Sequence, residues 1–183
     1  MLDNGPDASP NAWLDAWVER ERWCARSLHR ATRFGLIVLL LRGLSRLTDG
    51  VAWYALILAL PWLGGANGTA CALRMALLGG IDLVVYLAIK RHFARPRPFV
   101  GCSGVRPCAR TLDEFSFPSG HTLHAAGFAV LLCNYYPALV WVMVPLTALI
   151  GLSRVVLGLH YPSDVIAGAA IGAIMAESVL SLF

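Results

Sequence analysis

Phe117-Pro118-Ser119-Gly120-His121 comes directly before an apolar run that begins at Thr122, so this stretch lies where a hydrophobic helix begins. The first turn of a helix has backbone N–H groups without intrahelical acceptors, and the helix dipole adds partial positive charge there. Ser119 contributes a hydroxyl, and Gly120 allows the backbone to approach a ligand closely. We therefore predict that an anion, specifically a phosphate, binds at this helix start.

The composition is that of an integral membrane protein. Of the 183 residues, 57% are hydrophobic and 14% are charged, whereas a soluble domain is typically about a quarter charged. Mean hydropathy is +0.63. The length suits one transmembrane domain, which we place at residues 31–183 after an N-terminal segment at residues 1–30. Basic residues cluster at 20–46 and 90–110, and we expect them to meet membrane lipids rather than nucleic acid.

An amphipathic helix is predicted in the N-terminal segment, beginning at Ser9 and Pro10 and ending near Arg30. Apolar residues, among them Trp13 and Trp17, recur there at helical spacing, and most of the charged residues lie between them. Such a helix fits the plane of a membrane surface. The alternative is a helix that covers the loops of the bundle.

The apolar segments predict an all-α, polytopic bundle with about six membrane segments. They cover residues 31–47, 51–63, 70–89, 122–133, 138–152 and 161–183. The first is uncertain, because Arg33, Arg42 and Arg46 flank or interrupt it, and a short half-buried helix is the alternative. The last contains small residues at 167–170, which permit close packing between helices.

Counting these segments brings three basic stretches to one membrane face. The segment 70–89 delivers Lys90 to that face, where the long loop stays until His121. The next two segments cross and return, bringing Arg154 and His160 back. If residues 31–47 also cross, both termini lie opposite, and the arginines near the N-terminus mark that side as cytoplasmic. We therefore expect the site to face outward, which for a protein of the bacterial inner membrane, the localisation we expect, is the periplasm.

Cys102 and Cys108 lie close together in the polar loop. Two cysteines without a second pair of ligands make a poor zinc site, and nothing in the sequence suggests a metal or another cofactor. The two residues are either a disulfide, if the loop faces an oxidising compartment, or free thiols.

The stretch 90–98 carries the first group of candidate phosphate ligands. Lys90 offers a mobile point charge, and Arg97 offers a planar fork that matches phosphate oxygens. Arg91, His92 and Arg95 lie between them and are candidate contacts to lipid headgroups.

Two histidines are candidates for the chemistry itself. His121 suits a general acid or base near neutral pH. His160 and Asp164 are four residues apart at a helix start and share a face, so the carboxylate is placed to fix one ring nitrogen and free the other to attack. Taken singly, these features have plainer explanations, such as a helix cap or a buried hydrogen-bonded histidine.

Together, the three stretches resemble the type 2 phosphatidic acid phosphatase family. The pattern is Lys, six residues, Arg-Pro; then Pro-Ser-Gly-His; then Ser-Arg, five residues, His, three residues, Asp; and it is complete over roughly residues 70–170. The resemblance implies a metal-independent phosphatase in which His160 forms a phosphohistidine and Asp164 orients it. His121 would protonate the leaving oxygen and later activate water. The phosphate-binding residues implied by the resemblance are Lys90, Arg97, Ser119, Gly120 and Arg154.

The expected substrate is a lipid phosphate or diphosphate, because the predicted site lies at the membrane interface. Candidates within the family are polyprenyl diphosphates such as undecaprenyl diphosphate, phosphatidylglycerophosphate, phosphatidate and lipid A phosphates. Of these, a polyprenyl diphosphate or a glycerophospholipid phosphate is favoured. The alternatives are a non-catalytic phospholipid binder or transporter with the same basic pocket, and a family member acting on a soluble phosphate ester.

Overall fold

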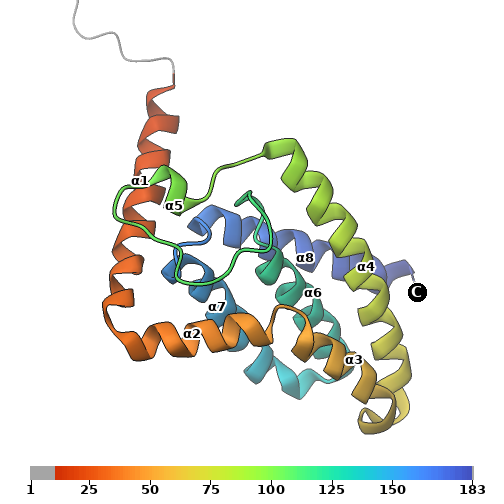
Figure 1. The fold of residues 1–183 in the computed structure, drawn as a ribbon. Helices are drawn as coiled ribbons and strands as arrows, with labels where there is room; N and C mark the ends of the chain where they lie inside the picture. The colour runs from red at the N-terminus through yellow and green to blue at the C-terminus, as the bar shows by residue number, and fades with distance from the viewer. Residues whose placement is uncertain (1–10, 183) are drawn as a thin grey trace, which may run out of the picture.

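The computed structural model describes residues 11–182, and its regular elements over that range are helices, as predicted (Figure 1). The α-helices are α1 (Ala12–His29), α2 (Gly35–Leu47), α3 (Val51–Leu63), α4 (Gly68–Phe93), α5 (Pro98–Gly101), α6 (Gly120–Tyr135), α7 (Val140–Val156) and α8 (Pro162–Leu182). Short 3-10 turns at Arg30–Arg33, Gly65–Asn67 and Pro137–Leu139 precede α2, α4 and α7. The helix start predicted at Ser9 and Pro10 lies outside the described residues.

Three helical stretches in the described range are long and apolar enough to cross a membrane: Gly65–Phe93, Pro137–Val156 and Pro162–Leu182. The shorter α3 is also apolar and pairs with α4, while α6 packs against α4, α7 and α8 in the middle of the bundle. This is an integral membrane protein, and each of the six predicted apolar segments is a helix.

The first of those segments, α2, lies along one face of the bundle instead of crossing it. Its 13 residues extend only about 20 Å at 1.5 Å per residue, against about 30 Å of bilayer hydrocarbon. Arg42 donates to the carbonyl of Cys108, Ser45 contacts Arg154, and Asp49 just after the helix contacts His121. The second half of α2 therefore lies at the face that carries the three motifs, and Val38 in its first half packs against Leu157 and Leu159 at that face. Beyond it, α3, α4, α6, α7 and α8 alternate in direction.

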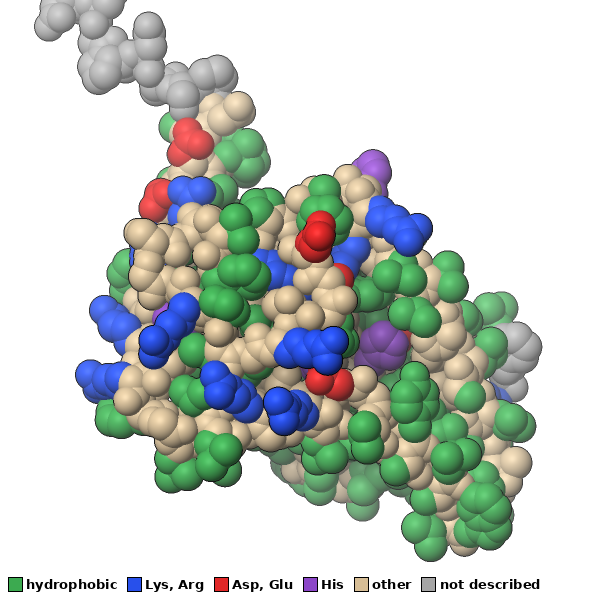
Figure 2. All heavy atoms as spheres, in the orientation of Figure 1, with side chains coloured by type: hydrophobic (Ala, Val, Ile, Leu, Met, Phe, Trp, Pro, Cys, Tyr) green, Lys and Arg blue, Asp and Glu red, His purple; other side chains and the backbone are tan. Residues whose placement is uncertain are grey.

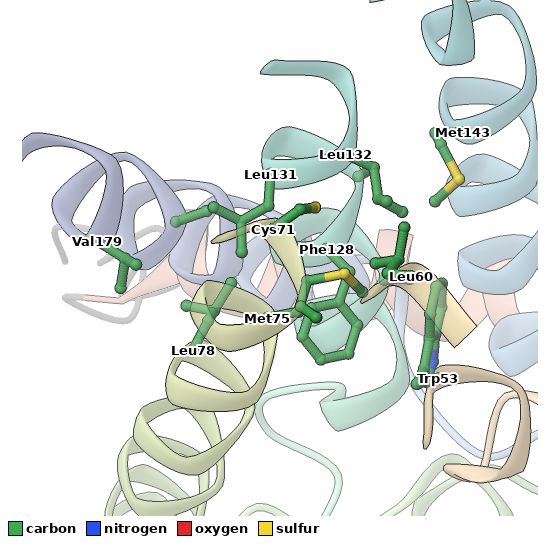
Figure 3. Packing of buried hydrophobic residues seen from close by; sticks show 14 of the residues in the cluster. Trp53, Leu60, Cys71, Met75, Leu78, Phe128, Leu131, Leu132, Met143 and Val179 are labelled. Carbon is green, nitrogen blue, oxygen red and sulfur yellow. The ribbon is translucent and has the colours of Figure 1, made fainter. Parts of the chain in front are cut away.

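The apolar core lies between α3, α4 and α6, with α7 and α8 closing it (Figure 3). The rings of Trp53 and Phe128 pack with centroids 5.1 Å apart, and Met75 and Leu78 are fully buried beside them. Lipid tails are as apolar as these side chains, so close packing between helices, rather than escape from water, holds this core together.

Glycines of α8 bring it into backbone contact with α6. A Cβ at Gly168 would lie 2.6 Å from the carbonyl oxygen of Ser119, and one at Gly172 would lie 2.0 Å from that of Leu123. The backbone N–H of Ser119 donates to the carbonyl of Asp164 at 2.9 Å. The close packing predicted for the small residues of the last helix is thus confirmed, and it fixes the start of α6 beside the start of α8.

Helix α1 packs on the same face as α2. Its buried side carries Glu21, Ala25 and His29, and the His29 ring lies 3.0 Å from the carbonyl of Val156 at the end of α7. Its other side exposes tryptophans, including Trp13 at 70%. The helix therefore covers loops of the bundle and also presents the apolar side of an interfacial helix, and a domain boundary at residue 30 stays a prediction.

Basic side chains gather over α1, α2 and the loop between α5 and α6, whereas the surface over α3 and α4 is mainly hydrophobic (Figure 2). The loop from Cys102 to Ser119 folds over the ends of α6, α7 and α8 (Figure 1). The three predicted basic stretches therefore meet at one face of the molecule.

Candidate active site

Two buried cations form the centre of the site. Lys90 is at the last turn of α4 and Arg97 directly precedes α5, and each is 2% exposed. Lys90 Nζ donates to the carbonyl of Phe115 at 2.6 Å and to the carboxylate of Asp113. Arg97 Nη2 donates to the same carboxylate at 2.8 Å, and the hydroxyl of Tyr86 does so as well.

The carboxylate of Asp113 thus lies where the cations converge. Burial raises its pKa, but the hydrogen bonds from Lys90 and Tyr86 outweigh that effect and lower the pKa to about 2. An ionised carboxylate presents the same kind of oxygen acceptors as a phosphate, so the cation pair is organised to bind an oxyanion.

His160 lies beside this pair and is 2% exposed. Its Nδ1 is 2.6 Å from the carbonyl oxygen of Ser116, which assigns the ring proton to Nδ1. Its Nε2 is 3.3 Å from Nη1 of Arg97. Burial, followed by the positive charges of Arg154, Arg97 and Lys90, holds the pKa of His160 well below 6.5. The ring is therefore neutral at neutral pH, with the Nε2 lone pair facing the cations.

Asp164 does not make the hydrogen bond to the histidine that its spacing predicted. The gap between His160 Nδ1 and Asp164 Oδ2 is 3.8 Å, which is beyond hydrogen-bond range, because the Ser116 carbonyl takes that nitrogen. Asp164 Oδ2 instead accepts from the Tyr161 N–H at 2.8 Å, and Oδ1 accepts from Arg95 at 2.7 Å. The carboxylate caps the start of α8 and so holds the short segment that carries His160.

Arg95, predicted as a candidate headgroup contact, is part of this inner network instead. Its two terminal nitrogens pair with Asp164 and, at 2.5 Å, with Glu21 of α1. It also donates to the hydroxyl of Ser163 at 2.8 Å, and the Ser163 N–H donates to Glu21 at 2.9 Å. The N-terminal helix is therefore joined to the start of α8 through charged groups. Arg91 and His92 are exposed and keep the predicted role as a hypothesis.

The start of α6 supplies the small residues predicted for it. Ser119 is fully buried, with its hydroxyl 3.0 Å from that of Thr122. Gly120 faces the ring of Tyr86, and a Cβ there would lie 2.7 Å from that ring. The next residue, His121, has Nε2 2.5 Å from Asp49 Oδ1.

Arg154 completes the cluster from the end of α7. It is 2% exposed, and Nη1 donates to the hydroxyl of Ser45 on α2. After burial, its positive charge is a further cause that lowers the pKa of both His121 and His160. The motif residues are thus brought together from α4, the loop, α6, α7 and α8.

Several polar partners of these residues were missed from the sequence: Glu21, Ser45, Asp49, Tyr86 and Asp113. Each lies in a helix, turn or loop whose local pattern has an ordinary structural explanation. Of these five residues, Asp113 alone could have been suspected from the sequence, because it is an acid within a basic loop, and that signal is weak.

Within residues 11–182, no group of three or more His, Cys, Asp and Glu side chains is arranged to hold a metal ion. Cys102 and Cys108 are buried free thiols. Of the two predicted alternatives, the structure therefore has free thiols and not a disulfide.

The fold and this centre define an integral membrane protein of the helical type, with a neutral histidine buried among three cations. The model of the PAP2 superfamily matches residues 67–183, and the chain belongs to this superfamily.

Proteins of known name extend the comparison. Undecaprenyl-diphosphatase BcrC of Bacillus subtilis is 32% identical over 123 residues, covering 67% of this chain and 63% of that protein. Decaprenylphosphoryl-5-phosphoribose phosphatase of Mycobacterium tuberculosis is 35% identical over 153 residues, or 77% of each chain. The crystal structure of Aquifex aeolicus LpxE superposes with a TM-score of 0.75 and 25% identity, covering 86% of this chain and 92% of that one.

Proposed function

We propose that this chain is a membrane phosphatase that removes phosphate from a lipid phosphate or diphosphate through a phosphohistidine intermediate. The observation that carries the proposal is the pair of contacts at His160. Its Nδ1 is fixed by the Ser116 carbonyl at 2.6 Å, and its Nε2 faces Arg97 at 3.3 Å. A neutral nucleophile beside fixed cations suits attack on phosphorus, since the cations neutralise the phosphate oxygens.

In the first step, the lone pair of His160 Nε2 forms a bond to phosphorus, and the bond from phosphorus to the leaving oxygen breaks. Lys90, Arg97 and Arg154 stabilise the charge on the transferring phosphoryl group. The Ser119 hydroxyl and the free Gly120 N–H of the first turn of α6 bind its oxygens. His121 gives a proton to the leaving oxygen.

In the second step, water attacks the phosphorus of the phosphohistidine while His121 takes a proton from the water. The N–P bond breaks, the electron pair returns to Nε2, and inorganic phosphate leaves. The cations thereby supply the charge neutralisation that phosphoryl transfer needs, and Asp164 keeps the His160 segment in place.

For the substrate, we propose a polyprenyl lipid phosphate or diphosphate. The names of both relatives describe enzymes that act on polyprenyl lipids. In this chain the centre lies at one end of apolar helices that are long enough to cross the membrane. A polyprenyl tail beside those helices would leave its phosphate at the level of Lys90 and Arg97.

The outward-facing site in a bacterial inner membrane stays a prediction. The sequence argument for it required residues 31–47 to cross, and α2 instead lies along the site face with α1. The arginines of both helices are therefore on the same side as the site and no longer support that argument.

The test is phosphate release from undecaprenyl diphosphate and phosphatidate by purified protein in detergent with a chelator, together with trapping of labelled phosphate on the protein. We expect turnover and an acid-labile phosphoryl adduct, both absent in His160→Ala. His92→Ala is the matched control, because His92 is an exposed histidine near the same face. Tight binding without turnover would favour the lipid binder, and full activity in His160→Ala would overturn the nucleophile assignment.

A further inference from the structure

We propose that Asp49, in the turn between α2 and α3, is the positioning residue that holds His121 ready to protonate the leaving group. The inference rests on the proposed phosphatase function. Asp49 lies outside residues 67–183, the part of the chain that matches the superfamily model, so the role is assigned from the geometry of this chain.

The contact itself is close and shielded. His121 Nε2 lies 2.5 Å from Asp49 Oδ1, and the two side chains are 9% and 33% exposed. With Nε2 bound to the carboxylate, Nδ1 is the ring nitrogen that remains for the substrate. The pairing thus orients the imidazole and leaves one nitrogen to carry the transferred proton.

The cations around the site make such a partner necessary. Burial, and with it the charge of Arg154, disfavours a positively charged His121 and lowers the pKa of the ring. The hydrogen bond and charge of Asp49 offset part of that effect. Burial raises the pKa of Asp49, but the hydrogen bond and charge of His121, with Arg154 and Arg110, lower it overall, so the carboxylate is ionised at neutral pH.

The turn that carries Asp49 is itself well fixed. The Thr48 hydroxyl donates to the carbonyl of Leu44 at 2.9 Å, and Thr48 is 7% exposed. The Asp49 N–H donates to the carbonyl of Arg46 at 3.3 Å. Gly50 has a φ of 132°, in the region that favours glycine. The carboxylate is therefore presented to His121 from a rigid turn.

In the proposed step, His121 reacts in its doubly protonated form, and the proton on Nδ1 moves to the leaving oxygen as the bond to phosphorus breaks. Asp49 stays ionised and keeps its hydrogen bond to Nε2. A leaving group that is already a weak base needs no such proton, whereas an alkoxide does. The role of Asp49 is therefore visible as a dependence on the leaving group.

The experiment compares Asp49→Asn with the wild type on dioctanoyl phosphatidate and on p-nitrophenyl phosphate in detergent. General acid catalysis typically contributes about 10²–10⁴-fold, so we expect kcat on the phosphatidate to fall about 10²-fold and kcat on the aryl ester to be nearly unchanged. Asp49→Glu keeps the carboxylate and should restore part of the loss. In a His121→Ala background, Asp49→Asn should have no further effect.

Equal losses on both esters, or no loss on either, would overturn the proposal. A second readout does not depend on turnover: a ring ¹⁵N NMR titration of His121 should give a lower pKa in Asp49→Asn than in the wild type, because the carboxylate stabilises the doubly protonated ring. An unchanged NMR signature would also overturn it. His160→Ala separates the role of Asp49 from the proposed phosphatase function. It should abolish turnover of both esters while leaving the NMR signal of His121 unchanged.

Discussion

Arg97 Nη2 donates to Asp113 Oδ1 at 2.8 Å, so a cation assigned to the phosphate is paired with a carboxylate of the protein itself. Lys90 binds the same oxygen. Under the proposed function, the substrate phosphate would compete with Asp113 for this one pair of donors, and the loop that carries Asp113 would have to release them when phosphate binds.

Replacing that carboxylate should strengthen inhibition by inorganic phosphate. A hydrogen bond to a charged group contributes about 1.5–3 kcal/mol, so Asp113→Asn should lower the inhibition constant for phosphate by about tenfold or more. The measurement is competitive inhibition of hydrolysis. Glu114→Gln is the control, because Glu114 is the exposed neighbour in the same loop. An unchanged or weaker inhibition in Asp113→Asn would show that the carboxylate organises the cations rather than competing for them.

The pH dependence of kcat/KM should extend unusually far into the acid range. The pKa of His160 lies well below 6.5, and that of Asp113 is about 2. As pH falls through 6.5, an ordinary histidine would gain a proton and lose its lone pair, but His160 stays neutral. We therefore expect no acid limb from the nucleophile near pH 6.5, and a limb there would contradict the buried neutral ring.

Unlike the activity, the free energy of unfolding should depend on pH in the acid range. The unfolded chain takes up a proton at His160 below pH 6.5, whereas the folded chain does not, so the unfolded state binds more protons. The free energy of unfolding should therefore decrease as pH falls below 6.5, as measured by thermal unfolding in detergent.

The link between α1 and α8 should contribute measurably to stability. Glu21→Gln removes the charge that pairs with Arg95 and weakens the acceptor for the Ser163 N–H. We expect a loss of about 2 kcal/mol, which corresponds to ~4–8 °C in melting temperature for a chain of this size. Glu19→Gln makes the same chemical change at an exposed ion pair on the same helix and should leave the melting temperature unchanged. Similar shifts in both variants would contradict the network.

The contact between α6 and α8 should tolerate no added methyl group. In Gly172→Ala, the Cβ would meet the Leu123 carbonyl at 2.0 Å, so the helices must separate. Overpacking costs about 1–3 kcal/mol, and a clash with backbone should reach about 3 kcal/mol, or ~6–12 °C. Gly80→Ala is the matched control, because a Cβ there meets nothing within 4 Å. A neutral Gly172→Ala would show that the two helices lie farther apart than described.

The membrane orientation is tested by a reporter fused after α8. Because α3, α4, α6, α7 and α8 alternate in direction from the site face, the end of α8 lies on the opposite face. A site facing the periplasm therefore predicts a fluorescent cytoplasmic reporter and an inactive alkaline phosphatase fusion at that end. The reverse pair of results would place the site in the cytoplasm.

The sequence predicted the helices and the meeting of the three motifs because both follow from local patterns. Apolar run lengths define the helices, and the direction of each span determines which motif ends at which face. The course of α2 was not predictable in the same way. Its composition suits a short span or a half-buried helix, and the choice depends on contacts with Cys108 and Arg154, far away in the chain.

The partners of the predicted site residues were the harder part. The spacing of His160 and Asp164 placed them on one face, as expected, but the Ser116 carbonyl is nearer to the ring. A backbone acceptor leaves no trace in residue identity. Asp49 and Glu21 are ordinary polar residues of a turn and an amphipathic helix, and only the fold shows what they bind.

The bond between Glu21 and Ser163 spans 142 positions, which has a consequence for biogenesis. The first helix leaves the ribosome long before its partner exists, and contacts of such long sequence separation form slowly. Helix α1 therefore cannot complete this contact before the residues around Ser163 have been synthesised. A chain arrested before that point holds Lys90, Arg97 and His121 already, yet it lacks the start of α8 that completes the candidate site.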